Sequence, residues 1–586
     1  MSRLNAFLLN VQENWPFFLG FAICLFLLLT GFDDFWLGAD DGYYAHTAER
    51  FLNGETPHVD FHEIHPGYIL WVNAAAMKLF GVTTLSLRYP LLFLSIIQCV
   101  LVWQLLRNSG RLPAMLGMIL VTSLGMPACA NPTANLYALF FAIAAFRVAA
   151  ETDLFDRPGK LVLLGLMIGL CVLFRHLSGI LFGCGMIIWL LSHPQIQHQR
   201  QTASRTNTFW GRLLLFLAFL GVAGYSINRS DLTGLSLFSF PALVIAVVAI
   251  WKARPDAKTV WNILISCSLG LFLAFLPLAV YLSSKGIWQV WLQDIVILPL
   301  SLISMPFIEA WRYSDLLVNV SGEISQITNT ISTINYLTWI GFVLVPGIAG
   351  WLVARRFAVQ FSPDNRQKAL PAFVVCAPFY GLASLHFEIP LYLIWSTPPL
   401  LLACFSLWGK PTRWQKVGFV GLVVITVGAQ TTLVAAPVWE RSFAQFVTTQ
   451  PGEFLADSRL GGRAQINLTT EETEFYQRLL ALIDENTTPS GSIFSFPSHP
   501  QWYFLSGRKN PTKHLFAGVS INSEHSLLEI GNQFTEHPPA MVIHKTNDKY
   551  GNTYTDRLRL WLDQRYQLIH SEKHFDFMVI KDRQPK

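Results

Sequence analysis

Two adjacent carboxylates follow the first long apolar run of the chain. Asp40 and Asp41 come directly after the run at 15–37, so they lie near the place where a membrane span would end. A charge there is costly unless it faces water or a protein cavity, and its default interpretation is functional. One carboxylate could act as a general base, or the pair could hold a divalent ion. The alternative is a solvated loop with ordinary polar residues.

The polar segment that begins with these carboxylates continues to about residue 68. Its pattern predicts a helical stretch at Tyr44–Leu52, then an irregular stretch, and then an amphipathic helix at Tyr68–Phe80 that ends at Gly81. The irregular stretch holds Asp60, His62, Glu63 and His65, so the acids and imidazoles of this segment are gathered between two helices.

The elements that must position these side chains are membrane helices. Hydrophobic residues make up 52% of the 586 residues and charged residues only 13%, whereas a soluble domain carries about 25% charged residues. Apolar runs predict about 13 spans. They cover roughly 15–37, 87–106, 113–129, 134–149, 161–174, 177–192, 212–226, 236–251, 260–283, 336–354, 370–386, 389–408 and 416–436. The first run has no small-residue cleavage site and is predicted to be a retained helix. All eight cysteines fall in apolar runs, which excludes a disulfide framework.

Basic residues orient these spans. With the N-terminus inside, every inner loop is basic, as the positive-inside rule requires. Examples are Arg107 and Arg111, Lys252 and Arg254, and Arg355 and Arg356. An odd number of spans then places residues 437–586 outside. The expected topology is a multi-pass membrane protein with a cytoplasmic N-terminus and a C-terminal domain on the outer side.

Three segments on the outer side are long enough to carry function. They are residues 38–86, residues 284–335 and the tail 437–586, which leaves residues 1–436 as the membrane domain. Residues 284–335 are too apolar for open water and too broken by proline to span, so we expect interfacial helices there, either a lid or a static belt. The tail predicts a small α/β domain with helices at Thr470–Leu482 and Thr555–Gln564. Its strands are predicted at Ser492–Phe496, Ala540–His544 and Phe575–Lys581.

The first outer segment resembles the GT-C superfamily of membrane glycosyltransferases. The resemblance is to the bacterial relatives of the protein mannosyltransferases and of the lipid A aminoarabinose transferase. It extends over about 50 residues, in which an acidic pair precedes an aromatic pair, a Gly-x-x-Pro-x-x-Asp-Phe stretch, a His-Pro, a helix ending Phe-Gly, and Arg-x-Pro. The matching residues are Asp40, Asp41, Tyr43, Tyr44, Gly54, Pro57, Asp60, Phe61, His65, Pro66, Phe80, Gly81, Arg88 and Pro90.

The resemblance implies a transferase that uses a polyprenyl phosphate carrying one sugar at the outer leaflet. Asp40 would deprotonate or orient the acceptor hydroxyl, with Asp41 beside it, and the reaction would invert the anomeric centre. Tyr43, Tyr44, Asp60 and His65 would line the substrate site. The partners would be the lipid-linked donor, membrane lipids and a glycan, lipid or protein acceptor, with no nucleic acid.

Cations for the donor phosphate are expected in the outer turns. Arg175 and His176 lie between two apolar runs, where a charge is expensive unless it meets a phosphate or carboxylate. Related enzymes carry a basic residue at about this turn, so Arg175 is assigned to the phosphate first and His176 second; the alternative is a side chain that reaches the lipid headgroups. His386 and Glu388 form a further pair that could bind phosphate, sugar or metal, or cap a helix.

One turn departs from the family pattern. Relatives often carry a second acid between spans three and four, whereas this chain has Asn131 and Asn135 there. An amide can hydrogen-bond an acceptor but cannot be a base at neutral pH, so Asn131 is expected to bind substrate. No cofactor is implied with certainty. A divalent ion held by Asp40, Asp41, Glu63 and His65, with His62 nearby, stays an alternative.

Two other classes of function compete with the transferase. A polytopic lipid or glycan transporter would show polar or broken helices at mid-membrane and an internal repeat, whereas the acids here gather outside. A non-catalytic lipid-binding scaffold is the third class. The sequence does not choose the sugar, the acceptor or the oligomeric state.

Overall fold

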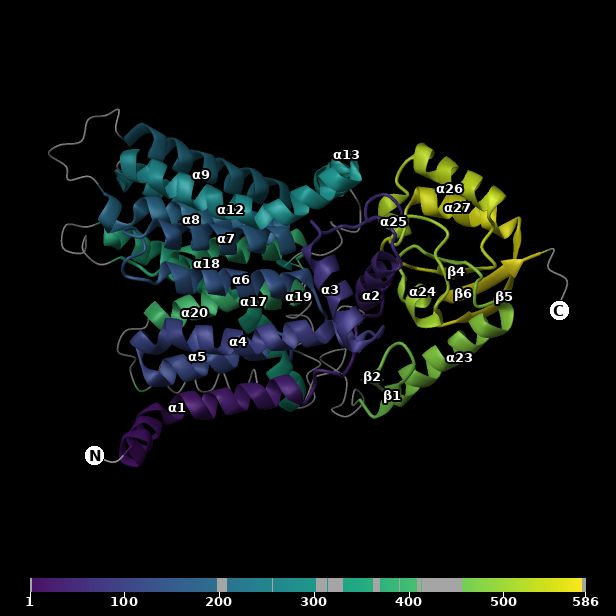
Figure 1. Cartoon of the computed structure of the whole chain (residues 1–586), viewed down its shortest axis with the longest axis horizontal. Helices are drawn as coiled ribbons and strands as arrows, with labels where there is room; N and C mark the ends of the chain where they lie inside the picture. Colours follow the sequence, from purple (N-terminus) through teal and green to yellow (C-terminus); the bar gives the residue numbers. More distant parts are fainter. Residues whose placement is uncertain are drawn as a thin grey trace.

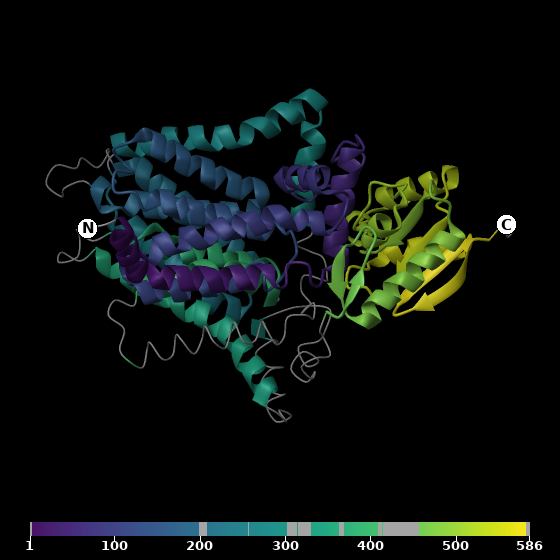
Figure 2. The same ribbon diagram turned by 60° about the horizontal axis from the view of Figure 1, so that its bottom comes forward.

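Two parts make up the structure, a bundle of apolar helices and a smaller domain of helices and strands (Figure 1). The computed structural model describes residues 3–197, 208–255, 257–301, 313–314, 330–361, 369–388, 390–407, 413 and 456–581. Helices α2 (Gly38–Leu52) and α3 (Tyr68–Phe80) lie between the two parts (Figures 1 and 2). The first outer segment is therefore placed between the bundle and the C-terminal domain.

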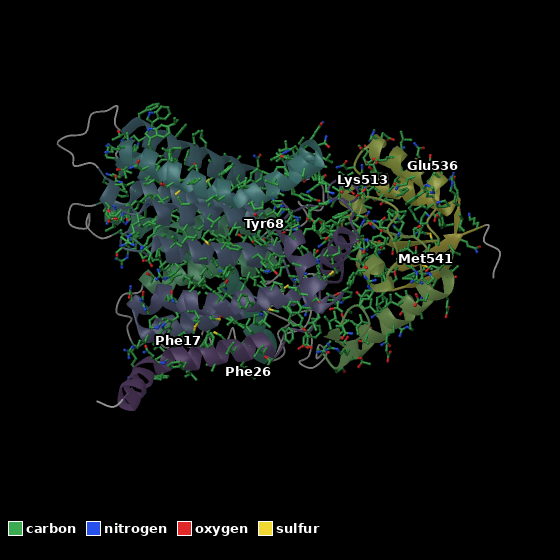
Figure 3. The ribbon with its side chains drawn as sticks, in the orientation of Figure 1. Phe17, Phe26, Tyr68, Lys513, Glu536 and Met541 are labelled. Carbon is green, nitrogen blue, oxygen red and sulfur yellow. The ribbon has the colours of Figure 1, made fainter. Side chains whose placement is uncertain are left out.

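The helices of the bundle follow the apolar runs of the sequence. Their outward faces stay apolar. In the most apolar stretch of 18 residues within α12, only 28% is buried, which suits a helix against lipid. Phe17 of α1 packs against Trp103 of α4, whereas Phe26 is exposed (Figure 3). The bundle contains α1 (Arg3–Leu29), α4 (Arg88–Leu106), α5 (Arg111–Ser123), α6 (Ala134–Ala149), α7 (Pro158–Phe174), α8 (His176–Ser192), α9 (Phe209–Arg229), α11 (Phe240–Lys252), α12 (Ala257–Lys285), α17 (Thr330–Gln360), α18 (Ala372–Gly381), α19 (Pro390–Ser396) and α20 (Pro398–Leu407).

Four of the described helical stretches are long and apolar enough to cross a membrane. They are Leu85–Ser109, Phe209–Arg229, Leu232–Lys252 and Ala257–Lys285, and further apolar helices are shorter. The chain is thus a multi-pass membrane protein of mostly helical structure. The count of about 13 spans stays a prediction, because the run at 416–436 and the boundary at 436 lie outside the described residues.

Two expected spans differ from the structure in their extent. The first run was expected to reach residue 37, but α1 ends at Leu29 and α2 begins at Gly38. Between them the chain pairs with the C-terminal domain, since Asp34 forms a bridge to Asn467. The run at 389–408 is two helices, α19 and α20, because Pro398 lacks the N–H group that would continue one helix.

The C-terminal domain is built on a four-stranded sheet. Its order is β3-β4-β6-β5, with β3 parallel to β4 and the other pairs antiparallel. This confirms the three expected strands as β3 (Ile493–Phe496), β4 (Met541–Lys545) and β6 (Phe575–Ile580), and the two expected helices as α23 (Thr470–Asn486) and α27 (Thr553–Asp563). The elements not expected are β1 (Ser458–Leu460), β2 (Ile466–Leu468), α24 (Gln501–Ser506), α25 (Ala517–Ser520), α26 (Glu524–Glu536) and β5 (Tyr566–Glu572).

The domain packs directly on the first outer segment. Gly42 of α2 lies so close to α24 that an added Cβ would be 2.3 Å from the Cα atom of Gln501, so only glycine fits there. The backbone N–H of Thr84 donates to the carbonyl of Arg463 at 2.9 Å, and the N–H of His62 to the carbonyl of Lys513 at 3.0 Å. Figure 3 places Lys513 on the side of the domain that faces the helices. The candidate site therefore has walls from both parts.

Candidate active site

The first turn of α2 carries both adjacent carboxylates. Asp40 and Asp41 stand where the unpaired N–H groups of a helix favour negative charge. Oδ2 of Asp41 accepts the backbone N–H of Leu37 at 2.7 Å. The start of α2 is therefore fixed by Asp41, one of the two carboxylates. The helix begins six residues before the expected Tyr44.

Asp41 is completely buried, with charged and polar partners. Its Oδ2 atom also accepts a 2.8 Å hydrogen bond from Nδ2 of Asn131, and its Oδ1 atom lies 3.8 Å from a guanidinium nitrogen of Arg88. Burial raises the pKa of the Asp41 carboxyl, and the Arg88 charge opposes that rise. Because Asp41 and Asn131 are both buried in this group, neither side chain is open to a substrate in this structure. The catalytic role of Asp41 and the binding role of Asn131 stay predictions.

Asp40 occupies a different environment, partly exposed beside three tyrosines. Burial and then the Asp40 charge raise the pKa values of Tyr44 and Tyr550 above their ordinary value. Tyr392 of α19 also lies within electrostatic range of Asp40. These tyrosines come from α2, from the C-terminal domain and from the bundle. Asp40 therefore lies within electrostatic range of one tyrosine from each of the three regions, and these three tyrosines are called the tyrosine lining below.

Arg175 reaches the same lining from the break between α7 and α8. A guanidinium N–H of Arg175 donates to the hydroxyl of Tyr392 at 3.0 Å. The guanidinium carbon lies 5.8 Å from the centre of that ring, a cation–π distance. The Arg175 charge also acts on Tyr44, where it opposes the effect of Asp40 on the tyrosine pKa. The carboxylate of Asp40 and the cation of Arg175 thus share two tyrosine neighbours.

The other expected phosphate ligands gather around Arg175. His176 and His386 both lie within its electrostatic range, and the ring of His386 is 5.7 Å from that of Tyr392. Arg229, at the end of α9, acts on His386 as well. The structure therefore brings together the three residues assigned to the phosphate and adds a second arginine to them.

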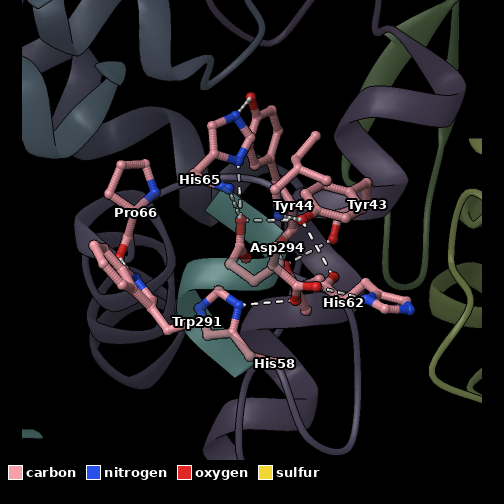
Figure 4. A network of polar contacts seen from close by, with 11 residues as sticks. Tyr43, Tyr44, His58, His62, His65, Pro66, Trp291 and Asp294 are labelled. Atoms are coloured by element: carbon pink, nitrogen blue, oxygen red, sulfur yellow. Dashed lines mark hydrogen bonds and ion pairs between the residues drawn. The ribbon is translucent and has the colours of Figure 1, made fainter. Parts of the chain in front are cut away.

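A buried carboxylate orients the imidazole of His65. Oε1 of Glu63 accepts the hydroxyl of Tyr43 at 3.0 Å, and the backbone N–H and Nδ1–H of His65 at 2.9 Å each (Figure 4). Since Nδ1 donates to the carboxylate, Nε2 is the acceptor, and it lies 3.4 Å from the hydroxyl of Tyr44. His65 also acts electrostatically on His176. Glu63 and His65 therefore contact Tyr43 and Tyr44 of α2, and His65 also lies within electrostatic range of His176 in the bundle.

Two expected substrate-binding residues accept hydrogen bonds from backbone N–H groups of the protein. Oδ2 of Asp60 accepts the backbone N–H of Thr56 at 2.6 Å, and Asp60 lines an outer groove of about 510 Å³ together with Arg50 and Lys513. Oε2 of Glu388 accepts the backbone N–H of Tyr313 at 2.7 Å. For these two residues a role in substrate binding stays a prediction.

The metal alternative finds no support in the geometry. Among the described residues, no group of three His, Cys, Asp or Glu side chains is placed to hold a metal ion. Asp41 is turned toward Arg88, whereas Glu63 is bonded to Tyr43 and His65. The four candidate ligands therefore do not converge on one point.

The sequence analysis missed three residues near Asp40 and Arg175, namely Arg229, Tyr392 and Tyr550. Arg229 is followed by Asp231 at the outer end of α9, and such a charged pair at the end of a span is a signal that could have been used. Tyr392 lies in an apolar run, where a hydroxyl needs a partner. Tyr550 gives no signal, because it lies in a soluble tail far along the chain.

A family model matches the part of the chain that carries His65, Asn131, Arg175 and His176, whereas Asp40 precedes the matched part. Residues 64–225 match the model described as "Dolichyl-phosphate-mannose-protein mannosyltransferase". Over this segment the match confirms the predicted resemblance, and with it the class of enzyme, a membrane glycosyltransferase of the GT-C type. A search of curated proteins finds no match.

The solved structures that the comparison finds include one of ArnT and one of an oligosaccharyltransferase. ArnT from Cupriavidus metallidurans bound to undecaprenyl phosphate is 13% identical, with a TM-score of 0.40, over 96% of this chain and 97% of that chain. The Archaeoglobus fulgidus oligosaccharyltransferase tethered to an acceptor peptide is 10% identical, with a TM-score of 0.41, over 91% of this chain and 69% of that chain.

Proposed function

We propose that the protein transfers one sugar from a polyprenyl-phosphate donor to an acceptor hydroxyl at the outer face of the bacterial inner membrane. The matched family takes its name from dolichyl phosphate mannose, a sugar of this donor class, which supports the lipid-linked donor. The basic inner loops support an outer position for α2 and the C-terminal domain.

One observation carries the proposal. The Asp40 carboxylate and the Arg175 guanidinium both act on Tyr44 and Tyr392. A base and a cation that both act on these two tyrosines suit an inverting transfer, in which a proton is removed at one end of the reacting line and negative charge develops at the other.

The step assigns each charge to a residue. Asp40 takes the proton of the acceptor hydroxyl while the oxygen of that hydroxyl forms a bond to the anomeric carbon. The bond from that carbon to the phosphate oxygen breaks, and its electron pair stays on the phosphate. Arg175 stabilises this charge, with His176, His386 and Arg229 around it. Attack from the face opposite the phosphate inverts the anomeric centre.

The remaining contacts exclude water and orient the sugar. Tyr392 is held by Arg175 and Tyr44 by His65, so their rings offer hydroxyls and flat apolar faces to a sugar. Tyr550 contributes from the C-terminal domain, which covers α2. Keeping water away protects the donor from hydrolysis.

Mass spectrometry of envelope lipids and glycans tests this function. A deletion strain should lack one sugar mass on one envelope component and accumulate the lipid-linked donor, and both should be restored by the wild-type chain. An unchanged glycan inventory in the deletion strain would contradict a transferase. A donor that accumulates on the inner leaflet alone would favour the transporter.

A further inference from the structure

An acidic side chain on the second outer segment binds two histidines of the first. Asp294 lies in the π-helical turn η6 (Gln293–Ile297), which follows α13 (Trp288–Leu292) and precedes α14 (Leu298–Ser301). It is 4% exposed. Its Oδ2 atom lies 2.9 Å from Nδ1 of His58, and its Oδ1 atom 3.0 Å from Nδ1 of His62 (Figure 4). Both carboxylate oxygens are therefore used by one loop.

The same helix also contacts the far end of that loop. The indole N–H of Trp291 donates to the carbonyl of Pro66 at 3.0 Å. Inside the loop, the backbone N–H of His58 donates to the carbonyl of Phe61 at 2.7 Å, and His58 has a left-handed φ of 70°. The loop is thus closed on itself and fixed at both ends to a single helical turn.

The loop held in this way carries the residues that orient the site. Glu63 and His65 lie between His62 and Pro66, and they bond Tyr43 and Tyr44 of α2. Displacement of His62 would move Glu63, the next residue, and with it the imidazole that faces Tyr44. Asp294 therefore acts on the site through His62, which lies one residue before Glu63 and three residues before His65.

The surroundings of Asp294 favour its ionised form. Burial alone would raise the pKa of its carboxyl, but the bonds from His58 and His62 outweigh burial and leave that pKa lowered. On the other side of the His62 ring lies His514 of the C-terminal domain, at 5.2 Å between ring centres, with Lys513 next to it in the chain. Three parts of the molecule therefore meet at His62.

The opposite face of this helix is apolar and exposed. Leu292, Val296, Ile297 and Leu300 are between 45% and 61% exposed, whereas Trp291, Asp294 and Ile295 are buried. A helix with one apolar exposed face and one bonded face suits the membrane surface. The interfacial position expected for residues 284–335 stays a prediction, and residues 302–312 and 315–329 lie outside the described residues.

We propose that Asp294 is a positioning residue of the transferase: it fixes the loop of His58 to Pro66 to the interfacial helix and thereby sets the place of Glu63 and His65 in the site. The proposal rests on the proposed function for its catalytic consequence. The mechanical part, the restraint of the loop, does not depend on it.

Hydrogen exchange of the full-length protein in detergent tests the restraint without any activity assay. In Asp294→Ala, amides in residues 58–66 should exchange at least tenfold faster than in wild type, with residues 493–580 unchanged. Gln293→Ala alters the exposed neighbour in the same turn and should leave exchange as it is. Equal exchange of residues 58–66 in wild type and Asp294→Ala would overturn the proposal, whatever the transferase assay gives.

Kinetics with a polyprenyl-phosphate sugar test the consequence. Asp294→Ala should lower kcat/KM for the donor at least tenfold, with most of the loss in kcat if Glu63 and His65 are misplaced. Asp294→Asn can still accept one imidazole N–H and donate to the other ring, so it should stay within about threefold of wild type. Equal loss in Asn and Ala variants, or no loss in either, would contradict positioning. No turnover by wild type would contradict the proposed function instead.

Discussion

Asp41 and Arg88 lie 3.8 Å apart, and both side chains are fully buried. Arg88 donates to the backbone carbonyls of Phe32, Asp34 and Phe35, so this pair ties α4 to the chain that leads into α2. Asp40, the residue before Asp41, lies within electrostatic range of Tyr44, Tyr392 and Tyr550 instead. The two adjacent carboxylates thus differ in environment, since Asp41 is fully buried beside Arg88 and Asp40 is partly exposed.

Removing the buried partner of Arg88 should destabilise the protein. Asp41→Ala removes the carboxylate beside the buried guanidinium of Arg88, and breaking a buried ion pair typically costs about 3–5 kcal/mol. Thermal unfolding in detergent should show a clear drop in Tm. Asp33→Ala is a matched control, since the Asp33–Arg459 pair is partly exposed and such pairs contribute about 0–1 kcal/mol. Equal melting of the two variants would contradict the structural role.

Loss of the Arg175 guanidinium should weaken use of the donor. Removing a charge-assisted bond to a phosphate costs about 1.5–3 kcal/mol, or roughly 10- to 150-fold in kcat/KM. Steady-state kinetics at varied donor concentration measure this. Arg147→Ala, which breaks an ion pair with Glu151 far from the tyrosines, should change nothing. An unchanged donor dependence in Arg175→Ala would mean that Arg175 only reaches the lipid headgroups.

Neutralising Glu63 should impair transfer by releasing His65. Glu63→Gln keeps the size of the side chain but replaces an acceptor of three hydrogen bonds with an amide that also donates. We expect turnover to fall about tenfold, in line with the loss of one charge-assisted bond. Glu529→Gln, at the surface beside Lys513, is the control. Turnover equal to wild type in Glu63→Gln would remove Glu63 from the site.

Acid should destabilise the C-terminal domain through His544. Burial, and then the Arg559 charge, lower the pKa of His544 from 6.5 to about 4 in the folded state. The neutral imidazole accepts a bond from Arg559 that the protonated form cannot accept. Because the folded pKa lies below the unfolded one, stability is complete above pH 6.5 and falls as the pH drops toward 4, by on the order of 3 kcal/mol. His544→Gln should flatten the dependence of Tm on pH in this window. The same slope in both proteins would contradict the assignment.

The sequence predicted those helices whose ends are set by a local signal. The amphipathic helix at Tyr68–Phe80 and its end at Gly81 agree with α3, since Gly81 has a φ of 100° that only glycine adopts easily. The short helices and the strand β5 of the tail were missed, because their packing depends on contacts with distant residues rather than on periodicity.

The candidate site could be predicted only in part for the same reason. Arg175, His176 and His386 are conspicuous as polar residues between apolar runs, and the structure brings them together. The different environments of Asp40 and Asp41 could not be foreseen, because they depend on Arg88 and Asn131, which lie about 50 and 90 residues away in sequence. The partnership of Asp294 with His58 and His62 joins residues more than 200 positions apart, beyond any local pattern.

The most direct measurement of the central claim compares turnover and donor binding in Asp40→Asn. An amide keeps the size and most contacts of the carboxylate but cannot take the proton of the acceptor hydroxyl. We predict that reconstituted Asp40→Asn binds a polyprenyl-phosphate sugar as wild type does and loses transfer by at least about 1,000-fold, within the range by which general base catalysis contributes. Transfer within about tenfold of wild type, with the same donor binding, would contradict Asp40 as the base.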